Sequence, residues 1–135
     1  MDEYRRGWAL RYLREARTEF VKAEENPIPS VSVSFALVSM KKAQTAIYYS
    51  LGDPEQLSFI VSEAMREKER TKNALMLLLV QIEQFIHNNS EMAETLKKDV
   101  ALREAKQLVD IASGIVELMI GKSTTEPVKD VSMPS

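Results

Sequence analysis

The sequence predicts an all-α fold, an up-down-up-down four-helix bundle with a long third helix and a disordered C-terminal tail. Three observations predict it. Apolar residues recur at spacings of three and four over most of the 135 residues, which is the period of a helix. Short segments with proline, glycine or asparagine divide the chain into four such stretches. Residues 122–135 have no periodicity and contain two prolines, so we expect a domain over residues 1–121 followed by a disordered tail.

The first predicted helix spans about residues 2–25, with Asp2 as its N-cap. It ends at Asn26-Pro27-Ile28-Pro29, because proline removes a backbone donor and disfavours helical geometry in the residue before it. Aromatic and alanine residues form its inner stripe: Tyr4, Trp8, Tyr12, Leu13, Ala16, Phe20 and Ala23.

The second helix is expected to begin with Ser30 or Ser34 as N-cap and to end at Gly52. Residues 30–35 alternate polar and apolar side chains, which is the period of a strand. A single six-residue strand without a partner would be an exposed edge, so we interpret the segment as helical. The inner stripe comprises Ala36, Met40, Ala43, Ile47 and Leu51.

The third helix is expected to run without a break from Pro54 to His87, since Asp53 can cap it and no glycine or proline interrupts it. At 1.5 Å per residue it would be about 50 Å long. Its segment Ala74–Ile86 is apolar almost all the way round. A helix of that kind needs protein on nearly every side, so we expect this segment to be the centre of the fold.

The fourth helix is expected to begin at the turn Asn88-Asn89-Ser90 and to end at Gly121. Its inner stripe comprises Met92, Leu96, Ala101, Ala105, Leu108, Ala112, Ile115 and Met119. In a four-helix bundle Gly7 would lie level with Gly114. The two glycines either allow a close approach of the first and fourth helices or are simply tolerated there.

The amino-acid composition excludes several classes of function. Apolar residues make up 44% of the chain, charged residues 28%, and the net charge is −2, so neither nucleic acid nor an anionic membrane is an expected partner. The chain has no cysteine, which excludes disulfides, thiolate metal sites and a cysteine nucleophile. No secretory signal or membrane-spanning run is apparent. We therefore expect a cytoplasmic protein.

The only candidate catalytic residue is His87, the single histidine, with Glu83 four positions earlier on the same helix face. A histidine at a helix C-terminus is also explained by the helix dipole. A di-iron bundle needs paired Glu-x-x-His sets, which one histidine cannot supply. The chain has no glycine-rich phosphate loop and no nucleophile elbow. We expect no catalytic set, no metal and no cofactor.

Two groups of residues are candidates for binding. Arg5, Arg11 and Arg14 lie on the first helix with Trp8, where contact with phosphate or RNA is conceivable. The same helix carries a similar number of acidic residues, so a solvated face is the alternative interpretation. Apolar residues beyond the inner stripe of the third helix indicate an interface between two copies of the chain: Met76, Leu77 and Val80. The alternative is a well-filled monomer core.

The segment ALVSMKKAQTAIYYSLGDP at residues 36–54 resembles the HEPN-like helical domains of archaea and bacteria, and WALRYLREARTEF at residues 8–20 is similar to the opening helix of that family. Catalytic HEPN domains are ribonucleases that carry arginine, four to six residues, and then histidine. No arginine precedes His87 at that spacing, and the nearest upstream one is Arg70. The resemblance therefore implies a non-catalytic relative that dimerises and works beside a nucleotidyltransferase partner.

The sequence thus favours a non-catalytic helical-bundle interaction protein that forms a homodimer. Two alternatives remain open. One is an atypical HEPN-type ribonuclease that combines His87 with Arg70 or Arg103 from another helix or subunit. The other is a bundle that binds a nucleotide or another small ligand between its helices.

Overall fold

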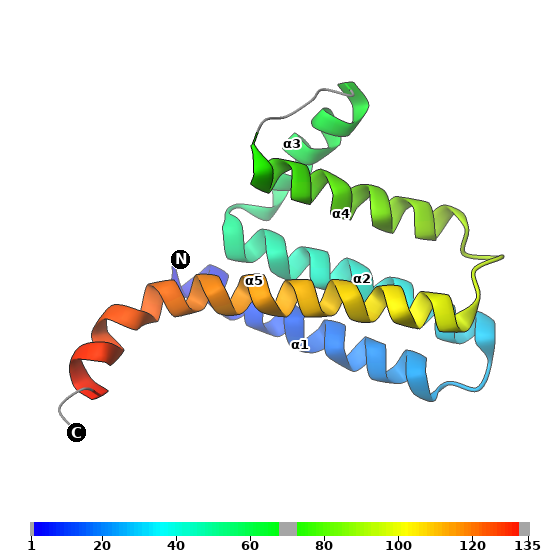
Figure 1. The fold of residues 1–135 in the computed structure, drawn as a ribbon, viewed down its shortest axis with the longest axis horizontal. Coiled ribbons are helices and arrows are strands. Elements are labelled where there is room, and N and C mark those ends of the chain that lie inside the picture. The colour runs from blue at the N-terminus through cyan, green and yellow to red at the C-terminus, as the bar shows by residue number, and fades with distance from the viewer. Residues whose placement is uncertain (1, 68–72, 133–135) are drawn as a thin grey trace.

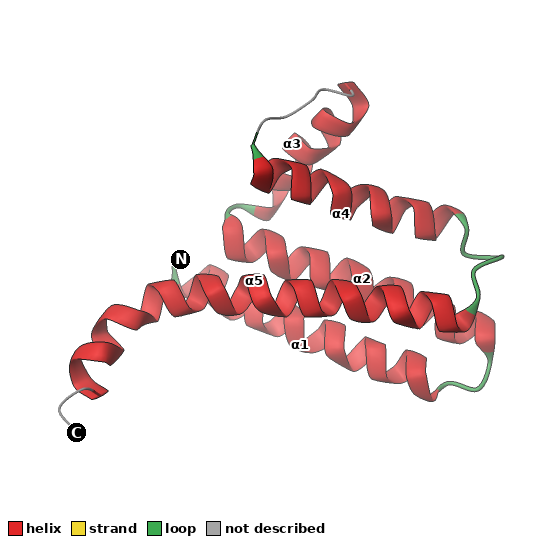
Figure 2. Ribbon diagram, viewed as in Figure 1, coloured by secondary structure: helices red, strands yellow, loops and turns green. Residues whose placement is uncertain are grey.

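The computed structural model describes residues 2–67 and 73–132, with side chains described for residues 2–66 and 73–121. Every regular element in this part of the chain is a helix (Figure 2), so the predicted all-α class is confirmed. The helices are α1 (Glu3–Glu25), α2 (Pro29–Leu51), α3 (Pro54–Glu67), α4 (Ala74–Glu91) and α5 (Lys98–Ser132).

Three of the helices form the packed centre of the molecule. Helices α1, α2 and α5 all pack against one another, whereas α4 lies on α2 with α3 beside it. Figure 1 shows that α1 and α4 run in one direction and that α2 and α5 run in the other. The short helix α3 connects the end of α2 to the start of α4.

The contact between α1 and α2 is made by small residues at seven-residue intervals. On α1 the fully buried residues include Ala9, Ala16 and Ala23. The Oγ atoms of two buried serines on α2 donate hydrogen bonds to carbonyl oxygens of α1: Ser32 to Ala23 at 2.5 Å and Ser39 to Ala16 at 2.7 Å. A serine side chain is short, so these bonds require the two backbones to lie close together. We call this contact the α1–α2 seam.

Helix α5 covers the seam with small residues of its own, since Ala101, Ala105 and Ala112 are fully buried. Two polar contacts fix its position. The Lys98 ammonium donates to the carbonyl oxygen of Asn26 at 2.7 Å, and the Arg17 guanidinium donates to Ser113 Oγ at 2.7 Å. The start and the middle of α5 are therefore both fastened to α1 or to the turn that follows it.

The first two helix boundaries are set by capping and by proline. The Asp2 carboxylate accepts a hydrogen bond from the Arg5 N–H at 2.8 Å, which confirms the predicted N-cap. Helix α2 begins at Pro29 with Ile28 as N-cap and no side-chain cap, so the prediction of Ser30 or Ser34 was wrong. Proline suits the first helical position because its fixed φ is already helical and its missing N–H is not needed there.

The predicted single helix from Pro54 to His87 is wrong. Helix α3 ends at Glu67, and α4 begins at Ala74 with Asn73 as N-cap, whose side chain accepts from the Met76 N–H at 3.1 Å. Residues 68–72 lie outside the described part. A continuous helix of about 50 Å would extend well past the 23-residue helices α1 and α2. The break instead lets the apolar second half fold back along α2.

The segment Ala74–Ile86 is helical as predicted, but it is not the centre of the fold. One side is buried through Leu79, Ile82 and Ile86, whereas Leu75 and Leu77 remain 46% and 45% exposed. Helix α4 rests on α2 and α3, and the three-helix centre lies on one side of it only. The expectation that this segment is covered on nearly every side is therefore wrong for the single chain.

Helix α5 also differs from the prediction. It begins at Lys98, because α4 continues to Glu91 and a turn follows, and it extends to Ser132 rather than ending at Gly121. Gly121 does not adopt the left-handed backbone of a helix-ending glycine. The structure places residues 122–132 in α5, so the disordered tail expected over residues 122–135 is not confirmed. A Cβ atom added to Gly7 or Gly114 would meet nothing within 4 Å, so these glycines do not serve a close approach.

Substitutions at Ser39 test the α1–α2 seam. We expect Ser39→Ala to lower the free energy of unfolding by about 1 kcal/mol, because one buried interhelical hydrogen bond is lost. Ser39→Leu is expected to cost more, about 3 kcal/mol, because the larger side chain forces the helices apart. Urea unfolding followed by circular dichroism measures both changes.

The matched control is Ser34→Ala, which removes an exposed serine of α2 whose hydroxyl donates to the Ser30 carbonyl of its own helix. This change should stay within about 0.5 kcal/mol of the unsubstituted protein. If Ser39→Leu were no more destabilising than Ser34→Ala, the close approach of α1 and α2 would be refuted.

Candidate functional site

Four aromatic rings from α1 and α2 form one cluster at the surface. Tyr49 of α2 stacks on both Trp8 and Tyr12 of α1, with ring centroids 6.1 and 5.6 Å apart. Trp8 also contacts Tyr12 at 5.9 Å and the exposed Tyr4 at 6.3 Å. The aromatic side of the predicted α1 stripe therefore lies beside the buried seam and ties the first half of α1 to the end of α2.

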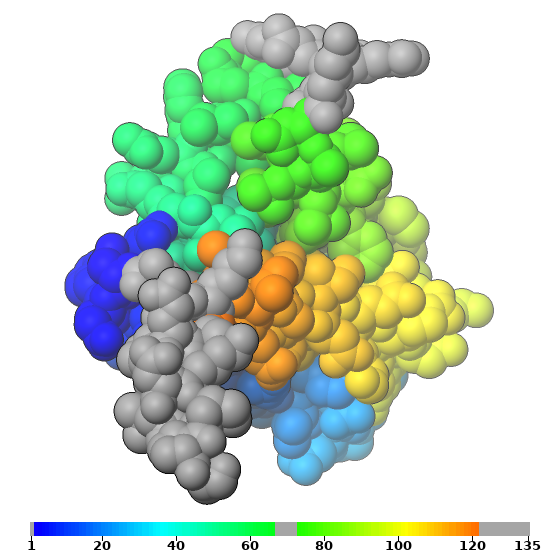
Figure 3. Space-filling view, turned by 60° about the vertical axis from the view of Figure 1, so that its left-hand side comes forward, coloured from blue at the N-terminus to red at the C-terminus, as the bar shows by residue number. Residues whose placement is uncertain are grey.

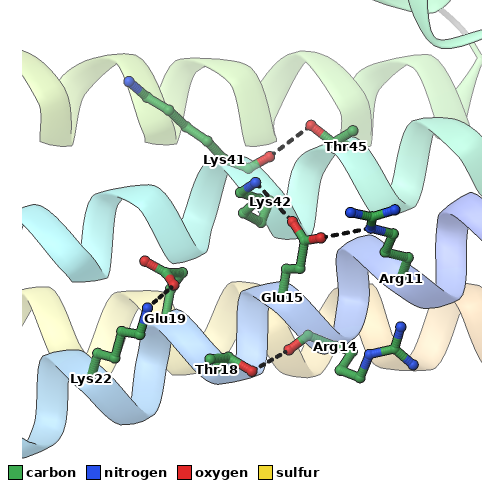
Figure 4. A network of polar contacts seen from close by, with 9 residues as sticks. All are labelled: Arg11, Arg14, Glu15, Thr18, Glu19, Lys22, Lys41, Lys42 and Thr45. Carbon is green, nitrogen blue, oxygen red and sulfur yellow. Dashed lines mark hydrogen bonds and ion pairs between the residues drawn. The ribbon is translucent and has the colours of Figure 1, made fainter.

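Two cations cover this cluster. The Arg11 guanidinium lies 5.0 Å from the centre of the Trp8 ring, and the Lys42 ammonium lies 5.3 Å from that of Tyr12. Both also pair with Glu15, at 2.9 and 2.8 Å (Figure 4). Hydrogen bonds from Lys42 and Arg11 lower the pKa of Glu15, and the bond to Glu15 raises the pKa of Lys42. The charges of Arg11, Lys42 and Glu15 are thus paired with one another beside the rings.

The candidate binding residues of α1 do not converge on one point. Trp8 and Arg11 belong to the aromatic cluster, whereas Arg5 binds Asp2 through both its backbone N–H and its guanidinium. Arg14 is exposed, and its guanidinium lies apart from that of Arg11 (Figure 4). The four side chains therefore do not form one site for phosphate or RNA in this structure. Their joint contact with such a ligand stays a prediction.

His87 lies exposed near the end of α4, with Nε2 3.5 Å from Glu91 Oε1. The predicted neighbour Glu83 instead accepts a hydrogen bond from Gln44 of α2. Of the arginines considered as catalytic partners, Arg70 lies outside the described residues and Arg103 is exposed on α5. In the described chain, no three histidine, aspartate or glutamate side chains are grouped so that they could hold a metal ion.

A polar network that the sequence analysis missed connects α2 to α4. The Gln44 side-chain amide donates to the Tyr48 hydroxyl at 3.2 Å and to Glu83 Oε1 at 2.5 Å. Tyr48 is only 6% exposed. Burial, and secondly the charge of Glu83, raise the pKa of Tyr48 to about 12. Gln44 and Glu83 lie 39 positions apart in sequence, so no local pattern could have revealed their contact.

An apolar groove lies between α4 and α5. Its volume is about 190 Å³, and its lining comprises Leu78, Gln81, Ile82, Phe85, Gln107, Leu108 and Ile111. Ile111 is 42% exposed and forms part of the rim. Figure 3 shows the surface of α4, in green, directly above that of α5, in yellow and orange.

None of the three predicted interface residues is among the described residues that line this groove, and only Leu77 lies next to its edge. Leu77 is exposed, and it lies four residues before Gln81 on the same helix face. Met76 and Val80 are partly buried and pack against the core. Leu77 is therefore accessible to a partner, whereas the side chains of Met76 and Val80 are partly buried against the core of the same chain.

The comparisons with protein-family models, with curated proteins and with solved structures found no match to this chain. The HEPN-like resemblance accordingly stays a prediction. None of the helices, over the residues described, is both long and apolar enough to cross a bilayer.

The raised pKa of Tyr48 predicts a loss of stability at high pH. Between its ordinary pKa of 10.0 and the folded value of about 12, the unfolded chain releases the hydroxyl proton while the folded chain keeps it. Below this window the contribution of Tyr48 is fully present, and it is lost as the pH rises from 10 to 12. We expect a fall of up to about 2–3 kcal/mol from this residue.

Comparison with Tyr48→Phe isolates that contribution, because every other titrating group is retained. The free energy of unfolding of Tyr48→Phe should fall less steeply between pH 10 and 12 than that of the unsubstituted protein. Tyr4→Phe, which removes an exposed hydroxyl, is the matched control. Equal slopes for Tyr48→Phe and the unsubstituted protein would contradict the burial of this hydroxyl.

Proposed function

We propose that the protein is a non-catalytic helical interaction protein that acts as a homodimer. The observation that carries the proposal is the apolar groove between α4 and α5, whose lining includes the exposed Ile111 and begins on α4 at Leu78, next in sequence to the exposed Leu77. Apolar recesses of this kind are typical of surfaces that another protein covers.

The shape of this surface favours a second copy of the chain as the partner. A two-fold interface uses the same patch on both subunits, so the patch must offer both projecting and receiving features. Here Leu77 and Ile111 project beside the recess formed by Leu78, Ile82 and Phe85. Each subunit can therefore place apolar side chains into the groove of the other.

The chemistry of the groove agrees with this proposal. Among the residues whose side chains are described, its lining consists of five apolar side chains and two glutamines, without a charged group. Depletion of charge is characteristic of the centre of a protein interface. Dimerisation would also cover Leu77, which the single chain leaves 45% exposed.

The resemblance to HEPN-like domains extends the proposal. A relative without the ribonuclease motif would act by binding, in the cytoplasm, as a dimer beside a nucleotidyltransferase partner. The exposed position of His87, whose Nε2 lies 3.5 Å from the exposed Glu91 carboxylate, supports a non-catalytic role over the ribonuclease alternative.

The oligomeric state tests the proposal. We expect a dimer in sedimentation velocity experiments at tens of micromolar protein, and a monomer for Ile111→Glu, because a carboxylate cannot be buried in an apolar interface without a large cost. Leu77→Glu should likewise shift the equilibrium from dimer toward monomer.

The matched controls are Leu10→Glu and Val21→Glu on α1. Leu10 and Val21 are 41% and 44% exposed, close to Ile111 and Leu77, but they lie on a different helix. Both controls should remain dimeric. A monomeric unsubstituted protein, or controls that dissociate as readily as Ile111→Glu, would refute the interface.

A further inference from the structure

A second, chemically different pocket lies between α2 and the beginning of α3. Its volume is about 460 Å³. Gln44, Thr45 and Tyr48 of α2 line one side, and Pro54, Glu55, Ser58 and Phe59 line the other. The described residues that line it are all different from those that line the groove between α4 and α5, so it is a separate site from the proposed dimer interface.

The side of the pocket on α2 offers one free acceptor and one free donor. Glu83 can only accept a hydrogen bond from the Gln44 amide, so the NH₂ group of Gln44 must face Glu83 and Tyr48. Within the described chain, the Gln44 carbonyl oxygen then has no donor. The Tyr48 hydroxyl accepts from Gln44 and keeps its own proton, for which the described residues provide no acceptor.

The side on α3 offers a carboxylate and an aromatic ring. Glu55 and Phe59 are four residues apart, so they are neighbours on one face of the helix. Phe59 is 65% exposed, which is unusual for a phenylalanine. None of the described residues that line the pocket is cationic, and Glu55 forms no ion pair with a described residue.

The N-terminus of α3 would normally repel a cation, because its free N–H groups carry partial positive charge. Here the Asp53 carboxylate accepts hydrogen bonds from the N–H groups of Glu55 and Gln56 at 2.9 and 3.2 Å. This cap offsets the positive end of the helix. The carboxylate of Glu55 therefore remains available for a positive charge from outside the chain.

We propose that this pocket binds an arginine side chain of a partner peptide. A guanidinium can donate to both the Glu55 carboxylate and the Gln44 carbonyl while its plane covers the ring of Phe59. The carbonyl of the peptide backbone accepts the proton of Tyr48. Each of the four groups without a partner thereby gains one.

The test is an NMR titration of the ¹⁵N-labelled full chain with acetyl-Gly-Arg-Gly-amide. We expect saturable shifts concentrated at the backbone amides of the pocket residues. The peptide with citrulline in place of arginine has nearly the same shape without the charge, and it should bind at least about threefold more weakly. Glu55→Gln and Phe59→Ala should each weaken binding of the arginine peptide by a similar factor.

The matched controls are Glu24→Gln, which removes an exposed carboxylate from α1, and Ile28→Ala, which removes an exposed apolar side chain. Both should bind like the unsubstituted protein. Equal affinity for the arginine and citrulline peptides, shifts outside the pocket, or equal weakening by the controls would each overturn the proposal. The result is independent of dimerisation, because Ile111→Glu leaves every pocket residue in place and should bind the peptide equally well.

Discussion

The close contact between α1 and α2 determines how the rest of the chain is arranged. Alanine and serine recur at seven-residue intervals along both helices, and Ser32 and Ser39 donate hydrogen bonds across the contact. Each bond pairs a buried hydroxyl, which would lower the free energy of unfolding if it were buried without a partner. Larger side chains at these positions would separate the backbones and break both bonds.

This contact explains why the molecule has a three-helix centre with two helices placed upon it. Once α5 covers α1 and α2 with its own small residues, the seam is closed on that side. Helices α3 and α4 then rest on α2, and α4 buries one side only. The apolar groove and the polar pocket both arise at the borders of this added pair of helices, because packing there is less complete than at the seam.

The helical class and several boundaries could be predicted from the sequence because their causes are local. Asp2 and Asp53 are capping residues next to the helices they cap, and the buried stripe of α2 has simple helical spacing. The break before α4 also has a local signal in Asn73, which directly precedes an apolar run. It was missed because no glycine or proline marks the end of α3 in the sequence.

The sequence predicted only in part which helices pack against one another and which residues form the groove and the pocket. The strand-like alternation at residues 30–35 reflects the buried Ser32 at the seam, which becomes clear only once its acceptor on α1 is known. Leu77 was recognised as a surplus apolar residue, but its partners in the groove come from α5. Gln44 and Glu83 meet only through the fold. Tertiary contacts of this kind leave no periodic signal in the sequence.

Native-state hydrogen exchange at low micromolar protein tests most directly whether the chain is organised around the α1–α2 seam. Our account predicts that the slowest-exchanging amides lie in the middle of α1, α2 and α5, because only global unfolding exposes them. The amides of α3 and α4 should exchange faster, through local opening of that pair of helices. Slowest exchange in Ala74–Ile86, with earlier opening of α1, would contradict it.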